Sequence, residues 1–170
     1  MRQAFFITGF NNWGKTTIIQ ELFDNTRFHL GKSYKISGVN ADFTVETHSN
    51  DDFIGQKWIE NIQNRIKKSA DNGKNLFTAL CPSLESSNNF LALLTQPTFA
   101  SYDKLHIFLI EFKWEHHAKL MIDNIITSAG QQLPNANFIS INNGKNHTEN
   151  KDGLNDMLLQ IRKELNTIFK

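Results

Sequence analysis

The chain of 170 residues carries 18 Lys and Arg against 17 Asp and Glu, a formal net charge of +1. This balance gives no electrostatic reason to expect nucleic acid or an anionic membrane as the main partner. The single cysteine, Cys81, excludes a disulfide framework within the chain and a multi-cysteine metal site, and it favours a cytoplasmic location. No apolar run approaches the ~20 residues of a membrane-spanning helix. We therefore expect one soluble domain over residues 1–170.

Short apolar runs alternate with longer amphipathic segments along the chain. We expect strands at residues 3–8, 34–39, 75–80, 104–111 and 136–141. Helical patterns occupy residues 15–24, 52–70, 82–94, 115–129 and 153–169. Pro82 suits the first position of the third helix. Residues 40–51 are ambiguous, and they either extend the second strand or form a loop above the sheet.

Five repeats of strand and helix predict an α/β fold. In this fold a doubly wound, mostly parallel sheet lies between two layers of helices, and right-handed crossovers connect its strands. We expect a three-layer arrangement with five strands, and we guess their order as 2-3-1-4-5.

One motif carries most of the functional information. Residues 9–17 read Gly-Phe-Asn-Asn-Trp-Gly-Lys-Thr-Thr and satisfy G-x-x-x-x-G-K-[ST], the Walker A pattern, directly between the first expected strand and a helix. In this spacing Gly9 leaves the strand in a conformation that excludes a side chain, and Gly14 lets the backbone approach phosphate oxygens. Lys15 then meets the β- and γ-phosphates, and the Thr16 hydroxyl completes a Mg²⁺ shell. The alternative is an ordinary glycine-rich turn between a strand and a helix.

Through Gly9, Gly14, Lys15 and Thr16 the chain resembles the P-loop NTPase superfamily, over roughly its first 25 residues. The resemblance implies a nucleoside triphosphate, ATP or GTP, bound with Mg²⁺. It also leaves open a homodimer or an unknown protein partner, because many such domains act as dimers. We expect the ligand-binding residues to be Gly9, Asn11, Asn12, Trp13, Gly14, Lys15, Thr16 and Thr17.

The acid that usually accompanies this motif is missing from its expected place. Members of the superfamily usually hold Mg²⁺ through an Asp at the end of a second core strand. The best strand for this role, residues 75–80, is followed by Cys81, Pro82 and Ser83, without a carboxylate.

Other carboxylates can substitute, because parallel strands end at the same edge of a sheet. The candidates are Asp42, Asp51, Asp52 and Glu111. We choose Asp42 as the catalytic and metal-binding acid, since it follows the second expected strand, where small-molecule kinases resembling this layout place a functional Asp. Asp52 suits a helix cap, because it immediately precedes a strong helical pattern.

The base of the nucleotide and the source of further positive charge stay open. The guanine-reading pattern N-K-x-D would fall on Phe112, Lys113, Trp114 and Glu115, where the Asn and the Asp are both replaced. The four arginines are scattered, which argues against a nucleotide kinase with an arginine-rich lid. Lys32, Lys35 or an arginine of a partner would have to supply additional charge.

These observations favour Mg²⁺-dependent binding of ATP or GTP with slow hydrolysis by a small P-loop NTPase. Lys15 would stabilise charge on the γ-phosphate, and Thr16 and Asp42 would hold the metal ion. The first alternative is a small-molecule kinase that uses ATP, which needs an acceptor pocket near residues 42–52. The second is a regulatory module that binds nucleotide without turnover.

Overall fold

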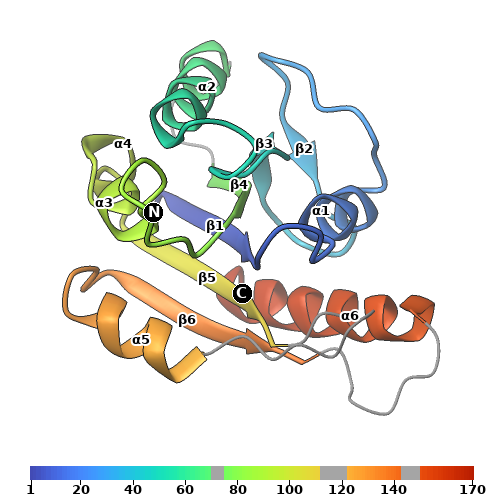
Figure 1. Ribbon diagram of the computed structural model, residues 1–170. Coiled ribbons are helices and arrows are strands. Elements are labelled where there is room, and N and C mark those ends of the chain that lie inside the picture. Colours follow the sequence, from blue (N-terminus) through green and yellow to red (C-terminus); the bar gives the residue numbers. More distant parts are fainter. Residues whose placement is uncertain (70–74, 112–121, 143–149) are drawn as a thin grey trace.

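The computed structural model of the protein describes residues 1–69, 75–111, 122–142 and 150–170. Helices lie on both faces of a six-stranded sheet (Figure 1). The strands are β1 (Gln3–Thr8), β2 (Tyr34–Lys35), β3 (Asp42–Glu46), β4 (Asn75–Leu80), β5 (Lys104–Ile110) and β6 (Ala136–Ile141). The helices are α1 (Lys15–Phe23), α2 (Gly55–Lys68), α3 (Phe90–Leu94), α4 (Pro97–Ala100), α5 (Ile122–Gly130) and α6 (Asn150–Ile168).

The strand order is β2-β3-β4-β1-β5-β6, which puts β1 near the middle of the sheet. All pairs are parallel except β2 with β3, which is antiparallel. Every residue of β1 and β4 is buried, because helices cover both faces of the sheet there. The expected α/β fold with a mostly parallel sheet is therefore confirmed.

The expectation of five strands was wrong in the region after α1. The second strand contains only two residues, and the chain then turns back near Gly38, whose φ of 80° lies in the left-handed region. After this turn Asp42 pairs with Lys35, and Phe43 pairs with Tyr34. The ambiguous residues 40–51 thus contribute a strand of their own, β3, and the guessed order 2-3-1-4-5 omits it.

The predicted third helix, residues 82–94, was also wrong in extent. It is replaced by an irregular segment followed by the short helices α3 and α4. The Asn89 side chain accepts hydrogen bonds from the N–H groups of Leu91 and Ala92, so α3 begins only there. Pro97, rather than Pro82, occupies the first turn of a helix.

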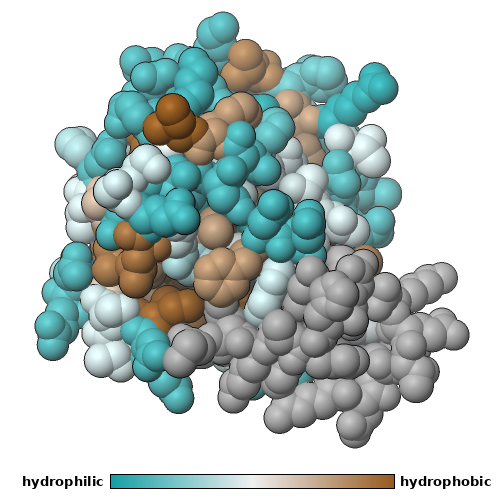
Figure 2. All heavy atoms as spheres, viewed as in Figure 1, coloured by the Kyte–Doolittle hydropathy of each residue, from teal (hydrophilic) through white to brown (hydrophobic). Residues whose placement is uncertain are grey.

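Phenylalanine side chains fill the core on both faces of the sheet. Phe5 packs against Phe43 and Phe77 with ring centroids 5.7 and 5.9 Å apart, on the face that α1 and α6 cover. Its neighbour Phe6 turns to the opposite face and meets Phe99 of α4 at 5.4 Å. On the face toward the viewer in Figure 2, the hydrophobic residues form separate groups among hydrophilic ones.

The helices α1 and α6 pack against each other on their shared face of the sheet (Figure 1). Arg162 of α6 donates hydrogen bonds to the carbonyl oxygens of Ser37 and Leu22. This guanidinium therefore ties the last turn of α1 and the turn before β3 to the C-terminal helix. None of the helices in the described ranges combines the length and apolar character that crossing a membrane would need.

A buried histidine lies near the start of β5. The His106 ring is only 5% exposed, stacks on Phe5 with ring centroids 4.8 Å apart, and its Nε2 lies 2.6 Å from Gln3 Oε1. Burial, aided by the nearby Lys104 charge, lowers the pKa of His106 from 6.5 to about 4. The imidazole is therefore neutral in the folded protein at pH 7.

This histidine predicts a loss of stability in mild acid. Because its pKa is lower in the folded than in the unfolded chain, the unfolded chain takes up the proton first, and stability falls as the pH drops from 6.5 toward 4. We expect His106→Phe, which keeps an aromatic ring, to remove up to about 3 kcal/mol of this pH dependence. Urea unfolding at pH 7 and pH 4.5 measures it. The exposed His29→Gln serves as control, and an unchanged pH dependence in His106→Phe contradicts the assignment.

Candidate functional site

The loop of residues 9–14 lies at the carboxyl edge of the central strands. It follows β1, and the Gly9 N–H donates to the Leu80 carbonyl at the end of β4 over 3.1 Å. On the other side, the Ile110 side chain at the end of β5 lies beside Gly9. Three strand ends therefore surround this loop, at the edge where α/β sheets bind ligands.

Two residues of this loop have backbone conformations in the left-handed region. Asn12 and Gly14 have φ values of 59° and 77°, and Gly14 is the N-cap residue immediately before α1. Gly9, in contrast, is not among the residues with positive φ. A Cβ there would lie 3.1 Å from the Trp13 Cβ and 3.3 Å from the Ile110 Cδ1. Gly9 is thus needed for close packing, whereas the expected special conformation was wrong.

Trp13 contributes packing to this loop. Its side chain is 6% exposed and meets the half-exposed Phe10 ring edge to face, with centroids 5.8 Å apart. The Trp13 side chain therefore lies in the interior and not on the surface. Asn11, Asn12, Thr16 and Thr17 are exposed around it.

The first turn of α1 points unused donors toward the loop. In the part of the chain that the structure describes, the N–H groups of Gly14, Lys15 and Thr16 have no protein acceptor. The start of a helix also carries the positive end of its dipole. This combination is suited to an anion.

Lys15 extends back across the loop. The side chain is only 7% exposed, and its Nζ donates to the Phe10 carbonyl over 2.9 Å. The same Nζ lies 3.7 Å from Asp51 Oδ2. A buried ammonium group needs such partners, and both are placed where phosphate oxygens could replace them.

Asp51 belongs to a tightly bonded turn after β3. Ser49 Oγ donates to both Asp51 and Asp52, and the Ser49 N–H donates to Asp52 Oδ2 over 2.7 Å. Asp52 therefore closes this turn and does not cap α2, which begins at Gly55 without a side-chain cap. Nearby, the Thr16 hydroxyl donates to the Thr47 carbonyl over 3.2 Å. The segment after β3 thus meets both Lys15 and Thr16.

Asn50 fixes this turn to the end of β4. The fully buried Asn50 side chain accepts from the Cys81 N–H at 2.7 Å and donates to the carbonyls of Cys81 and Asn88 at 3.1 and 3.0 Å. Burial, and then the Asp51 carboxylate, raise the pKa of Cys81 to about 12. The thiol therefore stays protonated at neutral pH, and Cys81 is a buried, free cysteine.

Asp42 does not reach this site, so its choice as the metal-binding acid needs correction. It begins β3 at the amino edge of the sheet, where it lies 4.0 Å from Lys35 and its carbonyl accepts from Asn75. The error arose because residues 34–39 were taken as one long parallel strand. Asp51, an alternative in the sequence analysis, is the acid that lies beside Lys15.

The remaining candidates are placed as follows. Glu111 directly follows β5, and its N–H donates to the Ile141 carbonyl at the carboxyl edge of the sheet. Lys32 is exposed in the segment before β2. The stretch 112–115, considered for reading the nucleotide base, lies outside the described residues.

The sequence analysis did not identify a second set of charged residues, which lies at the end of β3 and on α2. Glu46 ends β3 and lies 2.6 Å from Arg65 Nε and 2.8 Å from His48 Nδ1. Burial alone would raise the pKa of Glu46, but the His48 N–H and the Arg65 charge outweigh it, and the net pKa is lowered. No motif marks this set, since its members meet only after β3 and α2 have packed together.

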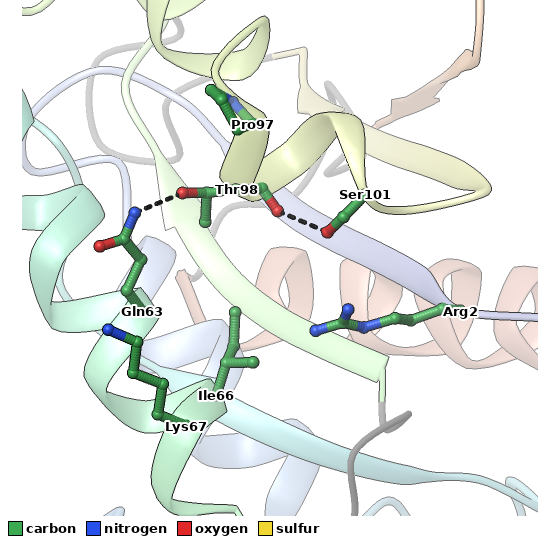
Figure 3. A pocket seen from close by; sticks show the side chains of 7 residues that line it. All are labelled: Arg2, Gln63, Ile66, Lys67, Pro97, Thr98 and Ser101. Atoms are coloured by element: carbon green, nitrogen blue, oxygen red, sulfur yellow. Dashed lines mark hydrogen bonds between the residues drawn. The ribbon is translucent and has the colours of Figure 1, made fainter.

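A cavity of about 590 Å³ opens beside the loop. Phe10, Asn11 and Asp51 form its side nearest the loop, and the segment after β4 forms the rest. A second cavity, of about 320 Å³, lies near the amino edge of the sheet between α2 and α4 (Figure 3). Of these two cavities, only the first is lined by Phe10 and Asp51, the residues that contact Lys15, so we treat it as part of the candidate site.

Comparison of the chain with family models, with curated proteins and with solved structures finds no match in any of the three.

The Asn50 contacts predict that this side chain holds the site together. Removing it in Asn50→Ala leaves backbone groups of Cys81 and Asn88 without their partners, so we expect the free energy of unfolding to fall by about 3 kcal/mol. Urea unfolding measures the change. The matched control is Asn64→Ala, an exposed residue of α2, for which we expect a change within about 0.5 kcal/mol. Equal effects of the two variants would contradict the role of Asn50.

Proposed function

We propose that the protein binds a nucleoside triphosphate with Mg²⁺ at the loop of residues 9–17 and hydrolyses it slowly, as a member of the P-loop NTPase superfamily. The observation that carries the proposal is the arrangement around Lys15. A buried cation, a turn with two positive φ values and the open N–H groups of α1 all converge on one point. A polyphosphate is the common ligand that uses all three.

The residues around this point fit a magnesium ion in part. Mg²⁺ is usually held by one or two protein side chains together with phosphate oxygens. The Thr16 hydroxyl donates its proton to the Thr47 carbonyl and keeps its oxygen lone pairs for a metal ion, whereas Asp51 would first have to leave Lys15. When bound, the ion would neutralise charge on the β- and γ-phosphates.

Asp51 is our candidate for the catalytic carboxylate in place of Asp42. Its carboxylate is 20% exposed, faces the cavity beside the loop and is oriented by Ser49. From this position it can hold water, either in the shell of the metal ion or in line with the γ-phosphate.

The first prediction from this proposal concerns binding. In Lys15→Ala the phosphates lose their buried cation, so we expect affinity for ATP or GTP with Mg²⁺ to fall by roughly 100-fold. Isothermal titration calorimetry measures it, with circular dichroism to verify folding. Lys68→Ala, which changes an exposed lysine at the last residue of α2, serves as control and should bind as the wild type does. Absence of binding by the wild-type protein at millimolar ATP and GTP would overturn the proposal.

The second prediction separates the two candidate acids. We expect Asp51→Asn to reduce phosphate release by roughly 10- to 100-fold, because the amide can neither take up a proton nor balance the metal charge. Asp42→Asn, at the opposite edge of the sheet, should leave the rate unchanged. Phosphate release from the bound nucleotide is the measurement. A larger effect of Asp42→Asn would show that the assignment to Asp51 is wrong.

A further inference from the structure

The cavity beside the loop has a charge pattern that restricts what can occupy it. Nine described residues line it, and among them are two acids, Asp51 and Glu85, but no Lys or Arg. Asn11, Ser83 and Asn88 add amide and hydroxyl groups that can bond to neutral polar ligands. An anionic ligand would find two like charges here and no described lining cation.

The same cavity also offers apolar surface. Phe10 and Leu84 line it and are 41% and 62% exposed. Pro82 adds a rigid apolar wall. At about 590 Å³ the cavity falls in the range of small-molecule sites, which combine apolar walls with a few polar groups.

The second cavity shows the opposite pattern within the same molecule. Arg2 and Lys67 line it, with no acid among the described lining residues (Figure 3). The Arg2 guanidinium, which lies 4.6 Å from the centre of the Tyr102 ring, points across this cavity toward Ile66. The second cavity thus has lining cations near the amino edge of the sheet, whereas the described residues that line the loop cavity include none.

We propose that the cavity beside the loop binds a neutral or positively charged small molecule with a hydroxyl group, and that this hydroxyl accepts the γ-phosphoryl group. The proposal rests on the proposed nucleotide binding at the loop. It makes the protein a small-molecule kinase, and hydrolysis is then the reaction that occurs without the acceptor.

Asp51 connects the two sites. It lines the cavity, and it lies 3.7 Å from the Lys15 ammonium that would hold the phosphate. The acceptor oxygen forms a bond to the γ-phosphorus, while the bond from phosphorus to the β-phosphate oxygen breaks and its electron pair leaves with the nucleoside diphosphate. The hydroxyl proton passes to the Asp51 carboxylate. Asn50 and Ser49 hold this carboxylate in position through the bonds described above.

The test measures transfer to matched acceptors of different charge. The wild-type protein is incubated with Mg²⁺ and γ-labelled ATP or GTP, and with pairs of probes: uridine and uridine monophosphate, glycerol and glycerate, choline and glycolate. We expect at least one neutral or cationic probe to be phosphorylated roughly 10-fold faster than its anionic partner. Chromatography and mass spectrometry identify the product.

Two variants sharpen this test. Glu85→Lys reverses one charge of the cavity, so we expect kcat/KM for a cationic acceptor to fall by roughly 10-fold or more, with a smaller effect for a neutral one. Glu60→Lys, a charge reversal of an exposed residue on α2, should change neither transfer nor hydrolysis.

The outcomes separate the two proposals. Nucleotide binding without transfer to any probe, or faster transfer to the anionic probes, overturns the acceptor proposal and leaves the nucleotide site standing. Absence of nucleotide binding by calorimetry overturns the proposed function itself, and the acceptor proposal with it.

Discussion

The hydrogen bonds of Asn50 join two segments that the sheet alone would leave separate. β3 and β4 pair through backbone hydrogen bonds, and this pairing ends before Cys81 in one segment and before the turn of residues 49–52 in the other. Beyond the last strand pair, Glu46 with Thr78, the amide of Asn50 joins the two segments again, because it bonds to both backbone groups of Cys81. Asp51 is the next residue in the chain, so its position beside Lys15 depends on this buried side chain. The candidate site is therefore held by an amide rather than by a regular element.

Much of the architecture followed from local patterns. Strands β1, β4, β5 and β6 are short runs in which apolar residues predominate, and the pattern located them within a residue or so of their observed bounds. The loop was located equally well, because the motif fixes the residue type at four of its positions. What failed was the region between α1 and α2. The strand β2 is short and antiparallel, and no local pattern distinguishes a two-residue edge strand from a longer buried one.

The wrong prediction of one long strand at residues 34–39 led to the choice of Asp42 as the metal-binding acid. Whether a carboxylate lies at the loop depends on which end of a strand it occupies, and one reversal of the chain near Gly38 moved Asp42 to the amino edge. The acid that lies beside Lys15, Asp51, is in a polar stretch whose structure comes from the side-chain bonds of Ser49, Asn50 and Asp52. Such bonds depend on the packed strands around them, so a sequence can propose these residues as candidates but cannot rank them.

The bond between Lys15 and the Phe10 carbonyl has a consequence for selectivity. Together with Asp51 it satisfies the lysine before any ligand arrives, so the loop does not present a bare positive charge to solution. A small anion with one charge would exchange two existing contacts for about as many new ones, with little net gain. A chain of phosphates could also engage the donors at the start of α1, which have no protein acceptor among the described residues. Because Lys15 already has contacts within the protein, we expect the number of contacts that a ligand makes at once to determine its affinity more than its charge does.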